Sequence, residues 1–264
     1  MKSIRSRLYG VLIVLCLCAG STSFGQVYFS HMGSEASGAD SGHTLRLLYH
    51  ATQQSTILRL TESKRIQYGA CWLMEKQQVD AGFSTYFEFQ ITDRAGSFPP
   101  DIVTEDVGGD GFAFVIQNVG TDAIGGAGGG LCYAGIPNSL AIEFDTWDNM
   151  QTKQVGVRDV DDNHIGVHTR GIDPNSECEA LALGQSSNLP ELSDGEVHTA
   201  RIDYVPGQLA VFIDDNEIPV ITVKVDLEET LALDEGKAWV GFTAATWDAY
   251  ENHDILRWAF TATP

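Results

Sequence analysis

The sequence has few basic residues. Its 264 residues include 16 lysines and arginines against 36 aspartates and glutamates, which gives a formal net charge of −20. A surface with this charge repels phosphate backbones and anionic lipid headgroups. The composition therefore argues against nucleic acid and membrane surfaces as partners, and it suits a chain that holds cations outside the cell.

Cysteine is also scarce, with five residues in the chain. Two of them lie in an apolar N-terminal run, and Cys71, Cys132 and Cys178 remain in the rest of the sequence. The spacing of these three does not match a zinc-binding pattern. An odd number of cysteines in a secreted chain allows at most one disulfide bond and leaves one thiol over, with the choice of pair open.

Hydrophobic runs long enough to cross a bilayer are absent. The apolar run over residues 11–19 is too short for this purpose. Basic residues precede the run and the small residues Ser23 and Gly25 follow it, an arrangement typical of a secretory signal peptide. We therefore expect a signal peptide over residues 1–25 with cleavage after Gly25, an extracellular location without membrane insertion, and a mature domain over residues 26–264.

Helical periodicity is lacking beyond a turn or two near residues 228–233. Instead, apolar and polar residues alternate over short segments with turn residues between them, which predicts β-strands. Strands are expected over residues 82–92, 111–117, 198–205, 208–214, 221–227, 237–246 and 254–261. Many alternating strands without helices predict an all-β fold, a two-sheet antiparallel β-sandwich or jelly roll.

One stretch, residues 139–169, gathers oxygen donors and a histidine. Side chains alternate along a strand, so Glu143 and Asp145 lie on the same side and repel each other unless a cation lies between them. Further donors follow at Asn149 and Asp159, and His164 begins a second strand-like run. Oxygen ligands suit calcium, whereas an imidazole with carboxylates suits a transition ion. The stretch indicates either a site for two cations that share carboxylates or an acidic, solvated hairpin loop.

The same stretch resembles a known family. The pattern Glu143-x-Asp145-x-Trp147-x-Asn149, followed by Asp159 and His164-Ile165-Gly166, is similar to the metal loop of the legume-type (L-type) lectins. Further segments match the strands of this family in the same order, and these are residues 58–61, 69–72, 82–85, 240–246 and 255–260. The resemblance covers nearly the whole chain after residue 25 and implies a concanavalin-like sandwich.

The resemblance divides the donors between two ions. The implied ligands are Glu143 and His164 for a transition ion, usually Mn²⁺, then Asp145 and Asp159 as bridges, and the Trp147 carbonyl and Asn149 side chain for Ca²⁺. The sequence departs from the family pattern after Asp159, where Val160 stands in place of the common proline. Asp161 and Asp162 also compete with Asp159 for the bridging position.

Two glycine-rich stretches have an implied role in sugar binding. Asp110 lies among three glycines directly before a buried strand, where composition alone equally allows a turn in which the aspartate caps its own backbone. The resemblance implies a cis peptide bond between Gly109 and Asp110, and a carboxylate that accepts hydrogen bonds from sugar hydroxyls. In the loop 125–133 it implies a backbone N–H donor at Gly128 or Gly129, where a side chain would block the approach of the sugar.

Aromatic and polar side chains complete the implied sugar site. Asn149 would donate through its amide, and the Trp147 ring would pack against the C–H face of a pyranose, unless it packs into the core. The loop 246–253 would form the remaining wall, with Trp247 and Asp248 in place of the glycine-rich start common in the family. The sugar is therefore open among mannose, glucose and galactose types.

These observations predict a secreted, metal-dependent lectin that binds glycans without catalysis and gains avidity from several sites, for example as a homo-oligomer. An enzyme is the alternative, because residues 143–148 are also similar to the Glu-x-Asp-x-x-Glu strand of retaining sandwich-fold β-glucanases. That similarity would make Glu143 the nucleophile and Asp148 the acid/base. A third interpretation is a structural or adhesive sandwich whose cations stiffen its loops.

Overall fold

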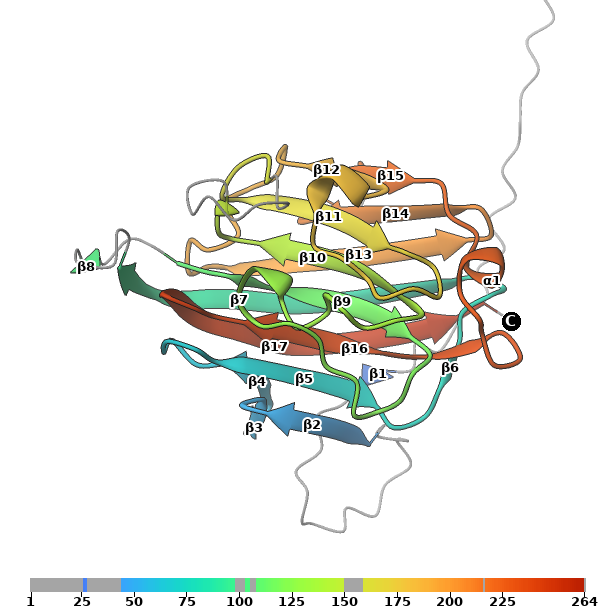
Figure 1. Ribbon diagram of the computed structural model, residues 1–264, viewed down its shortest axis with the longest axis horizontal. Coiled ribbons are helices and arrows are strands. Elements are labelled where there is room, and N and C mark those ends of the chain that lie inside the picture. Colours follow the sequence, from blue (N-terminus) through green and yellow to red (C-terminus); the bar gives the residue numbers. More distant parts are fainter. Residues whose placement is uncertain are drawn as a thin grey trace, which may run out of the picture.

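The structure is a computed structural model that describes residues 26–27, 44–97, 103–104, 108–149, 159–215 and 217–263 (Figure 1). Strands predominate, and the short helical turns are η1 (Gly128–Gly130), η3 (Glu179–Leu181) and α1 (Leu227–Thr230). Across these ranges no helix is long and apolar enough to cross a membrane. The predicted signal peptide, residues 1–25, lies outside the described residues.

The strands form two antiparallel sheets. In the described part of the chain, the order in the first sheet is β15 (Ile221–Val223), β14 (Gln208–Ile213), β13 (Val197–Val205), β7 (Phe83–Ser97), β17 (Ala249–Ala262), β4 (Ile57–Thr61) and β3 (Thr52–Gln54). Two short strands join it, β1 (Gln26–Val27) on β17 and β8 (Val103–Thr104) on β7. The order in the second sheet is β12 (Gly184–Ser186), β11 (His164–Thr169), β10 (Ser139–Asp145), β9 (Gly111–Gln117), β16 (Lys237–Ala245), β5 (Tyr68–Leu73) and β2 (Leu45–Tyr49), with β6 (Gln77–Gln78) on β16.

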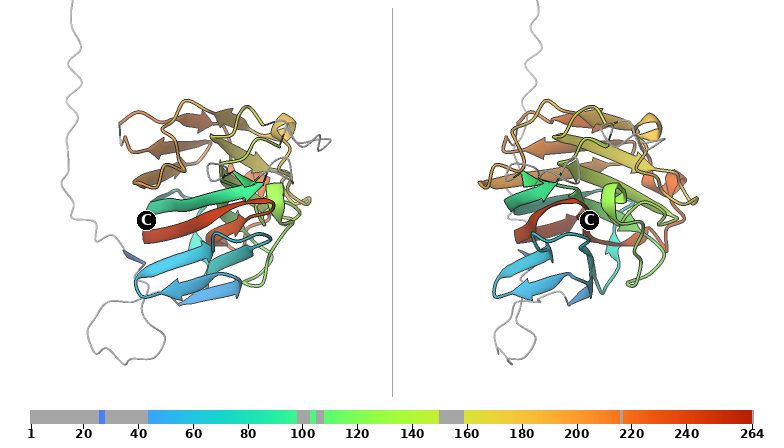
Figure 2. Two further views of the ribbon diagram at one scale, coloured as in Figure 1. Left: turned by 90° about the vertical axis from the view of Figure 1, so that its left-hand side faces the viewer. Right: turned by 60° about the vertical axis from the view of Figure 1, so that its left-hand side comes forward.

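The two sheets lie face to face and share one core, as Figure 2 shows. Aromatic rings from both sheets meet there: the rings of Phe89 in β7 and Phe144 in β10 lie 5.5 Å apart, and Phe144 stacks on Phe112 of β9 at 4.6 Å. Each of these side chains is buried. The predicted all-β antiparallel sandwich is therefore confirmed, and the alternation over residues 82–92 supplies one wall of its core.

The expected strand over residues 221–227 is shorter in the structure. β15 ends at Val223, and Leu227 begins the single turn of α1 instead. The carboxylate of Asp226 accepts hydrogen bonds from the backbone N–H groups of Glu228 and Glu229, so this residue caps the turn. The capping aspartate, and not the apolar pattern, decides the conformation here.

The final strand is longer than expected, because β17 begins at Ala249 and not at residue 254. Its first residues pair with β7 although they carry polar side chains. Glu251 and His253 are fully buried there, with the His253 Nε2 3.2 Å from the Glu251 Oε1. Their other polar atoms pair with the hydroxyls of Thr61, Thr146 and Ser193, so polar side chains can be buried here and the strand lacks the apolar alternation of the other strands.

The cysteines do not form a disulfide within the described residues. Cys71 and Cys132 are buried free thiols, and Cys178 is half-buried.

Candidate metal and carbohydrate site

The ends of four strands meet at one edge of the second sheet. Asp145, the last residue of β10, lies opposite His164 at the start of β11 and opposite Gly111 at the start of β9. Ala245 at the end of β16 also lies opposite Gly111. The register therefore brings the metal-type side chains of β10 and β11 next to Asp110, which directly precedes β9.

The alternation of β10 determines which side chains reach this site. Ile142 and Phe144 point into the core between the sheets, so Glu143 and Asp145 lie on the other face. Both carboxylates are nonetheless buried, at 2% and 3% exposure. The Tyr133 hydroxyl covers Glu143 and donates to its Oε2 at 2.6 Å. Two buried carboxylates on one strand face, as the sequence predicts, indicate a cation site.

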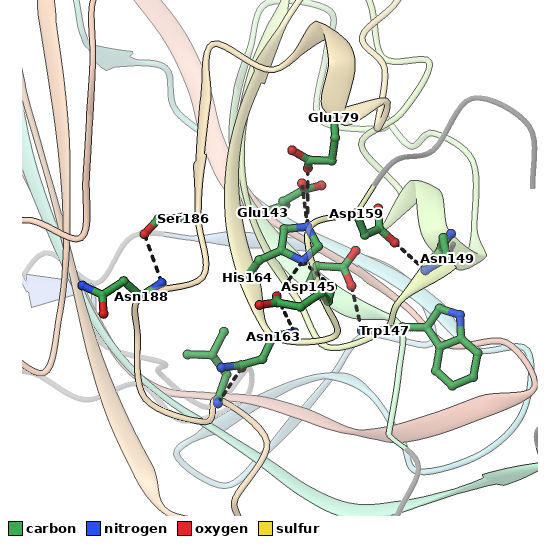
Figure 3. Close-up of polar contacts among 12 residues, drawn as sticks. Glu143, Asp145, Trp147, Asn149, Asp159, Asn163, His164, Glu179, Ser186 and Asn188 are labelled. Carbon is green, nitrogen blue, oxygen red and sulfur yellow. Dashed lines mark hydrogen bonds and ion pairs between the residues drawn. The ribbon is translucent and has the colours of Figure 1, made fainter. Parts of the chain in front are cut away.

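His164 is oriented as a metal ligand requires. Its Nδ1 donates to the backbone carbonyl of Asp161 at 3.0 Å, which leaves the Nε2 as the acceptor nitrogen. The Nε2 is buried and lies 3.7 Å from the Glu143 Oε1 (Figure 3). Glu143, Asp145 and His164 are thus brought together.

Two residues of this cluster were missed in the sequence. Glu179 in η3 lies with its Oε1 3.4 Å from the His164 Nε2 (Figure 3), and His168 lies with its Nε2 2.7 Å from the Glu143 Oε1. His168 is four residues after His164, so strand alternation places it on the same face and could have revealed it. Glu179 follows β11 in an irregular segment beside Glu177, where no periodicity indicates which glutamate points inward.

Asp159 lies beside Asn149 in the cluster. Its Oδ2 accepts a hydrogen bond from the backbone N–H of Asn149, and Asp145 accepts one from the backbone N–H of Trp147 at 2.7 Å (Figure 3). Asp159 is buried, whereas Asp161 is half-buried and Asp162 is exposed. The bridging role of Asp159 stays a prediction, and its position suits that role better than the positions of its two competitors. The loop 150–158 lies outside the described residues.

The protonation of the cluster reflects its concentration of acidic groups. Burial, with the nearby Glu143 carboxylate, raises the pKa of Asp145 well above its usual range, and burial raises the pKa of Asp159 to about 6. Burial disfavours a charged His164, but the Glu143 and Glu179 carboxylates outweigh burial and raise the pKa of this imidazole to about 12. These pKa shifts indicate that the clustered carboxylates are stabilised by a positive charge among them.

The residues fit a divalent transition ion. Single atoms of Glu143, His164 and Glu179 all lie within 4.8 Å of one another. Two of the buried atoms here, the His164 Nε2 and the Glu179 Oε2, have no hydrogen-bond partner among the described residues. Buried polar atoms in proteins are normally paired, so these two are free to bind an ion. An imidazole with carboxylates is the donor set of a first-row transition ion.

Asp110 has the conformation that the resemblance implies. The Gly109–Asp110 peptide bond is cis. The Asp110 carbonyl accepts from the Thr146 N–H at 3.0 Å, which ties the turn to the end of β10. Its side chain is buried, and the Oδ2 has no hydrogen-bond partner in the part of the chain that is described. Burial and the Glu251 carboxylate raise the pKa of Asp110 well above its usual range.

Gly128 and Gly129 lie beside the other predicted sugar ligands. A Cβ atom at Gly129 would lie 3.1 Å from the Asn149 Cγ and closer still to its Nδ2. A Cβ atom at Gly128 would lie 3.7 Å from the Trp247 ring. The loop therefore packs its backbone against Asn149 on one side and Trp247 on the other. The structure brings these four residues together, and their roles in binding stay predictions.

The remaining predicted residues lie at the rim. Trp147 is half-buried, and its ring points away from the metal cluster (Figure 3). Trp247 is 50% exposed. The Asp248 carboxylate is half-buried and forms an ion pair with Arg65, which anchors the loop after β16. The Trp247 indole is thus exposed at the surface, whereas Asp248 already has a cationic partner.

The alternative of a β-glucanase finds little support in this geometry. The carboxylate oxygens of Glu143 contact the Tyr133 hydroxyl and the His168 imidazole, and the side chain is only 2% exposed. A glycosidase nucleophile must reach the anomeric carbon of its substrate. Since Glu143 is enclosed, its position does not suit a glycosidase nucleophile.

Comparisons with known proteins give the family. The legume lectin β-barrel domain matches residues 34–257. A probable L-type lectin-domain containing receptor kinase S.7 from Arabidopsis thaliana is 30% identical to this chain; the match covers 68% of this chain and 26% of the relative. Lectin 6 from Medicago truncatula is also 30% identical, over 69% of this chain and 63% of the relative. The aligned part thus spans less than two thirds of each relative.

A solved structure agrees with these relatives. The crystal structure of basic winged bean lectin with Tn-antigen superimposes with a TM-score of 0.65 and 26% identity, covering 90% of this chain and 95% of that chain. The strand order, the register at the sheet edge and the sequence similarity lead to the same family. This chain belongs to the legume (L-type) lectins.

Proposed function

We propose that this protein is a secreted lectin in which Ca²⁺ and a transition ion such as Mn²⁺ hold a glycan-binding site in shape. The observation that carries the proposal is the convergence of strand ends described above. Asp110, Asn149 and the glycine loop meet directly beside the buried carboxylates of Glu143, Asp145 and Asp159.

Each sugar contact has a chemical role. The buried Asp110 carboxylate accepts hydrogen bonds from sugar hydroxyls, and the Asn149 amide donates one. The backbone N–H of Gly128 or Gly129 donates from the rim, where the absence of a side chain admits the sugar. The indole of Trp147 packs on the apolar face of the pyranose, and Trp247 forms the opposite wall.

The metal ions act on the shape of the site. Divalent ions would offset the repulsion among the buried carboxylates and fix the backbone at both ends of the loop between β10 and β11. Glu143 and His164 would hold the transition ion, Asp145 and Asp159 would serve both ions, and the Trp147 carbonyl and the Asn149 side chain would hold Ca²⁺. Because Asn149 serves both calcium and sugar, sugar binding depends on the metal.

The glycan partner is proposed from the chemistry of the site. The winged bean lectin was solved with Tn-antigen, a precedent for glycan binding in this fold. Trp247 and the Asp248–Arg65 ion pair form the wall of this site, so its sugar specificity is expected to differ from that of the relatives. A small site of this kind binds a monosaccharide with a Kd on the order of 0.1–1 mM, or about 4–5 kcal/mol. Homo-oligomerisation would then supply avidity.

A glycan array tests the proposal. We expect binding to a defined set of glycans in the presence of Ca²⁺ and Mn²⁺, and loss of that binding for Asp110→Asn, which replaces a carboxylate by an amide at the hydroxyl-accepting position. The control is Asp122→Asn, which removes the same charge from an exposed residue paired with Arg46. An array without hits, or release of reducing sugar from β-glucans that is lost in Glu143→Gln, would contradict a lectin without catalysis.

A further inference from the structure

Two buried residues at the metal cluster, His168 and Glu179, are not among the ligands assigned in the proposed two-ion site. The His168 Nε2 lies 2.7 Å from the Glu143 Oε1 and 3.2 Å from the Glu179 Oε1. The His168 and Glu179 side chains are only 1% and 2% exposed. Burying an ionisable pair costs free energy unless it is compensated, so these residues call for an explanation.

We propose that Glu179 is a ligand of the transition ion beside Glu143 and His164, and that His168 is a positioning residue that holds the two glutamates toward the ion. The inference rests on the proposed function, because it assigns further residues to the same metal centre. The ion is a first-row divalent transition ion.

The first support is the geometry of the three ligand atoms. They come from three elements, β10, β11 and η3, and lie within 4.8 Å of one another. The His164 Nε2 faces the Glu179 Oε1 at 3.4 Å without a hydrogen bond between them, and the Glu179 Oε2 also has no partner among the described residues. An ion bound between these two side chains would give a partner to both the His164 Nε2 and the Glu179 Oε2.

The second support is that Glu179 is held firmly in place. Within η3 the N–H of Ala182 donates to the Glu179 carbonyl at 3.1 Å, and directly after it the N–H of Leu183 donates to the Val167 carbonyl of β11 at 2.8 Å. The turn is therefore fixed to the strand that carries both histidines. A ligand on an anchored element keeps its position when the ion leaves.

The third support is the space above β11. Gly166 lies between the two histidines on the same strand face, and a Cβ atom there would lie 3.0 Å from the Glu179 Oε1 and closer to the Glu143 and His168 side chains. Because residue 166 has no side chain, the two carboxylates and the His168 ring can gather over the strand. His168 then donates its Nε2 proton to carboxylate oxygens, an outer contact that orients metal ligands.

Cobalt binding to the full chain tests the assignment. After removal of bound metal, Co²⁺ is titrated into the wild type, Glu179→Gln, His168→Gln and the control Glu177→Gln, and the visible d–d bands are recorded. We expect at least tenfold weaker binding and changed bands for Glu179→Gln, and wild-type behaviour for Glu177→Gln. His168→Gln should weaken binding by about tenfold while the bands stay in place, since the ligand set is unchanged.

A measurement on the wild type decides the question even if a variant does not fold. Mn²⁺ takes roughly six ligands, so Glu143, Asp145, Asp159 and His164 alone would leave about two positions for water. With Glu179 bound, electron–nuclear double resonance of the Mn²⁺ form should detect about one water. Two waters, or unchanged Co²⁺ affinity and bands in Glu179→Gln, would overturn the assignment of Glu179 and leave the proposed lectin function intact. A wild-type protein that takes up neither Co²⁺ nor Mn²⁺ would overturn the transition-ion site as a whole.

Discussion

Replacing Gly129 by alanine should weaken sugar binding without damage to the fold. The new Cβ atom would lie 3.1 Å from the Asn149 Cγ and still closer to the Nδ2, whereas ordinary contacts between such atoms are about 3.5–4.0 Å. The Asn149 amide would therefore have to move by on the order of an ångström. A hydrogen bond whose donor moves that far is lost, since hydrogen bonds need donor–acceptor distances of about 2.7–3.2 Å.

The size of the effect follows from the bond that is lost. One neutral hydrogen bond contributes about 0.5–1.5 kcal/mol, so the Kd for a monosaccharide should rise by roughly two- to tenfold. The backbone of Gly129 does not have a positive φ, so alanine is sterically allowed there and the free energy of unfolding should change little. Isothermal titration calorimetry measures the affinity, and urea denaturation measures the stability.

The matched control is Gly126→Ala in the same loop. A Cβ atom at Gly126 would have its nearest neighbour, the Ala134 carbonyl oxygen, at 3.8 Å, which is an ordinary contact. This variant should bind sugar like the wild type. If Gly129→Ala also binds like the wild type, Asn149 is not a sugar ligand in the proposed geometry.

Two further predictions concern the core and the pH dependence. Phe144→Ala should lower the free energy of unfolding by about 3–5 kcal/mol in urea denaturation, because the ring is fully buried and contacts Phe112 of its own sheet and Phe89 of the opposite sheet. A loss below about 1 kcal/mol would show that this ring does not contribute to the packing between the sheets. In chelator-treated protein, the melting temperature should fall as the pH rises from about 5 to about 7, since the pKa of Asp159 is raised to about 6 in the fold while the unfolded side chain ionises near 3.8. A pKa raised on folding stabilises the fold below the unfolded value, and that stability is lost as the pH passes the folded value. A melting temperature that rises over this range, or that Ca²⁺ and Mn²⁺ do not restore at pH 7, would contradict the origin of this shift in crowded carboxylates.

The fold could be predicted from the sequence wherever apolar alternation governs the strand. The strands that carry Phe87, Phe112 and Phe144 follow this rule, because their apolar side chains point toward the opposite sheet. The rule fails at the start of β17, where the buried polar atoms of Glu251 and His253 are paired with each other and with nearby hydroxyl groups. It also fails after Val223, where the Asp226 carboxylate begins a helical turn. Both exceptions depend on contacts that no local pattern shows.

The site was predictable to the extent that its residues share one strand or one motif. Alternation places Glu143 and Asp145 on one face of a strand, and the resemblance to the L-type lectin metal loop adds His164; the antiparallel pairing of β10 with β11 then brings the three together. Glu179 comes from a 3-10 turn that returns to the cluster after an irregular segment, so only the folded chain reveals it. The ion pair of Asp248 with Arg65 joins residues far apart in the sequence, and no spacing predicts it.

The central claim is that metal ions hold the sugar site in shape, and calorimetry with one sugar tests it most directly. A glycan that binds on the array is titrated into the protein with Ca²⁺ and Mn²⁺, again after chelation, and again after both ions are restored. We predict at least tenfold weaker binding after chelation and full recovery on restoration. Equal affinity in all three titrations would contradict the claim.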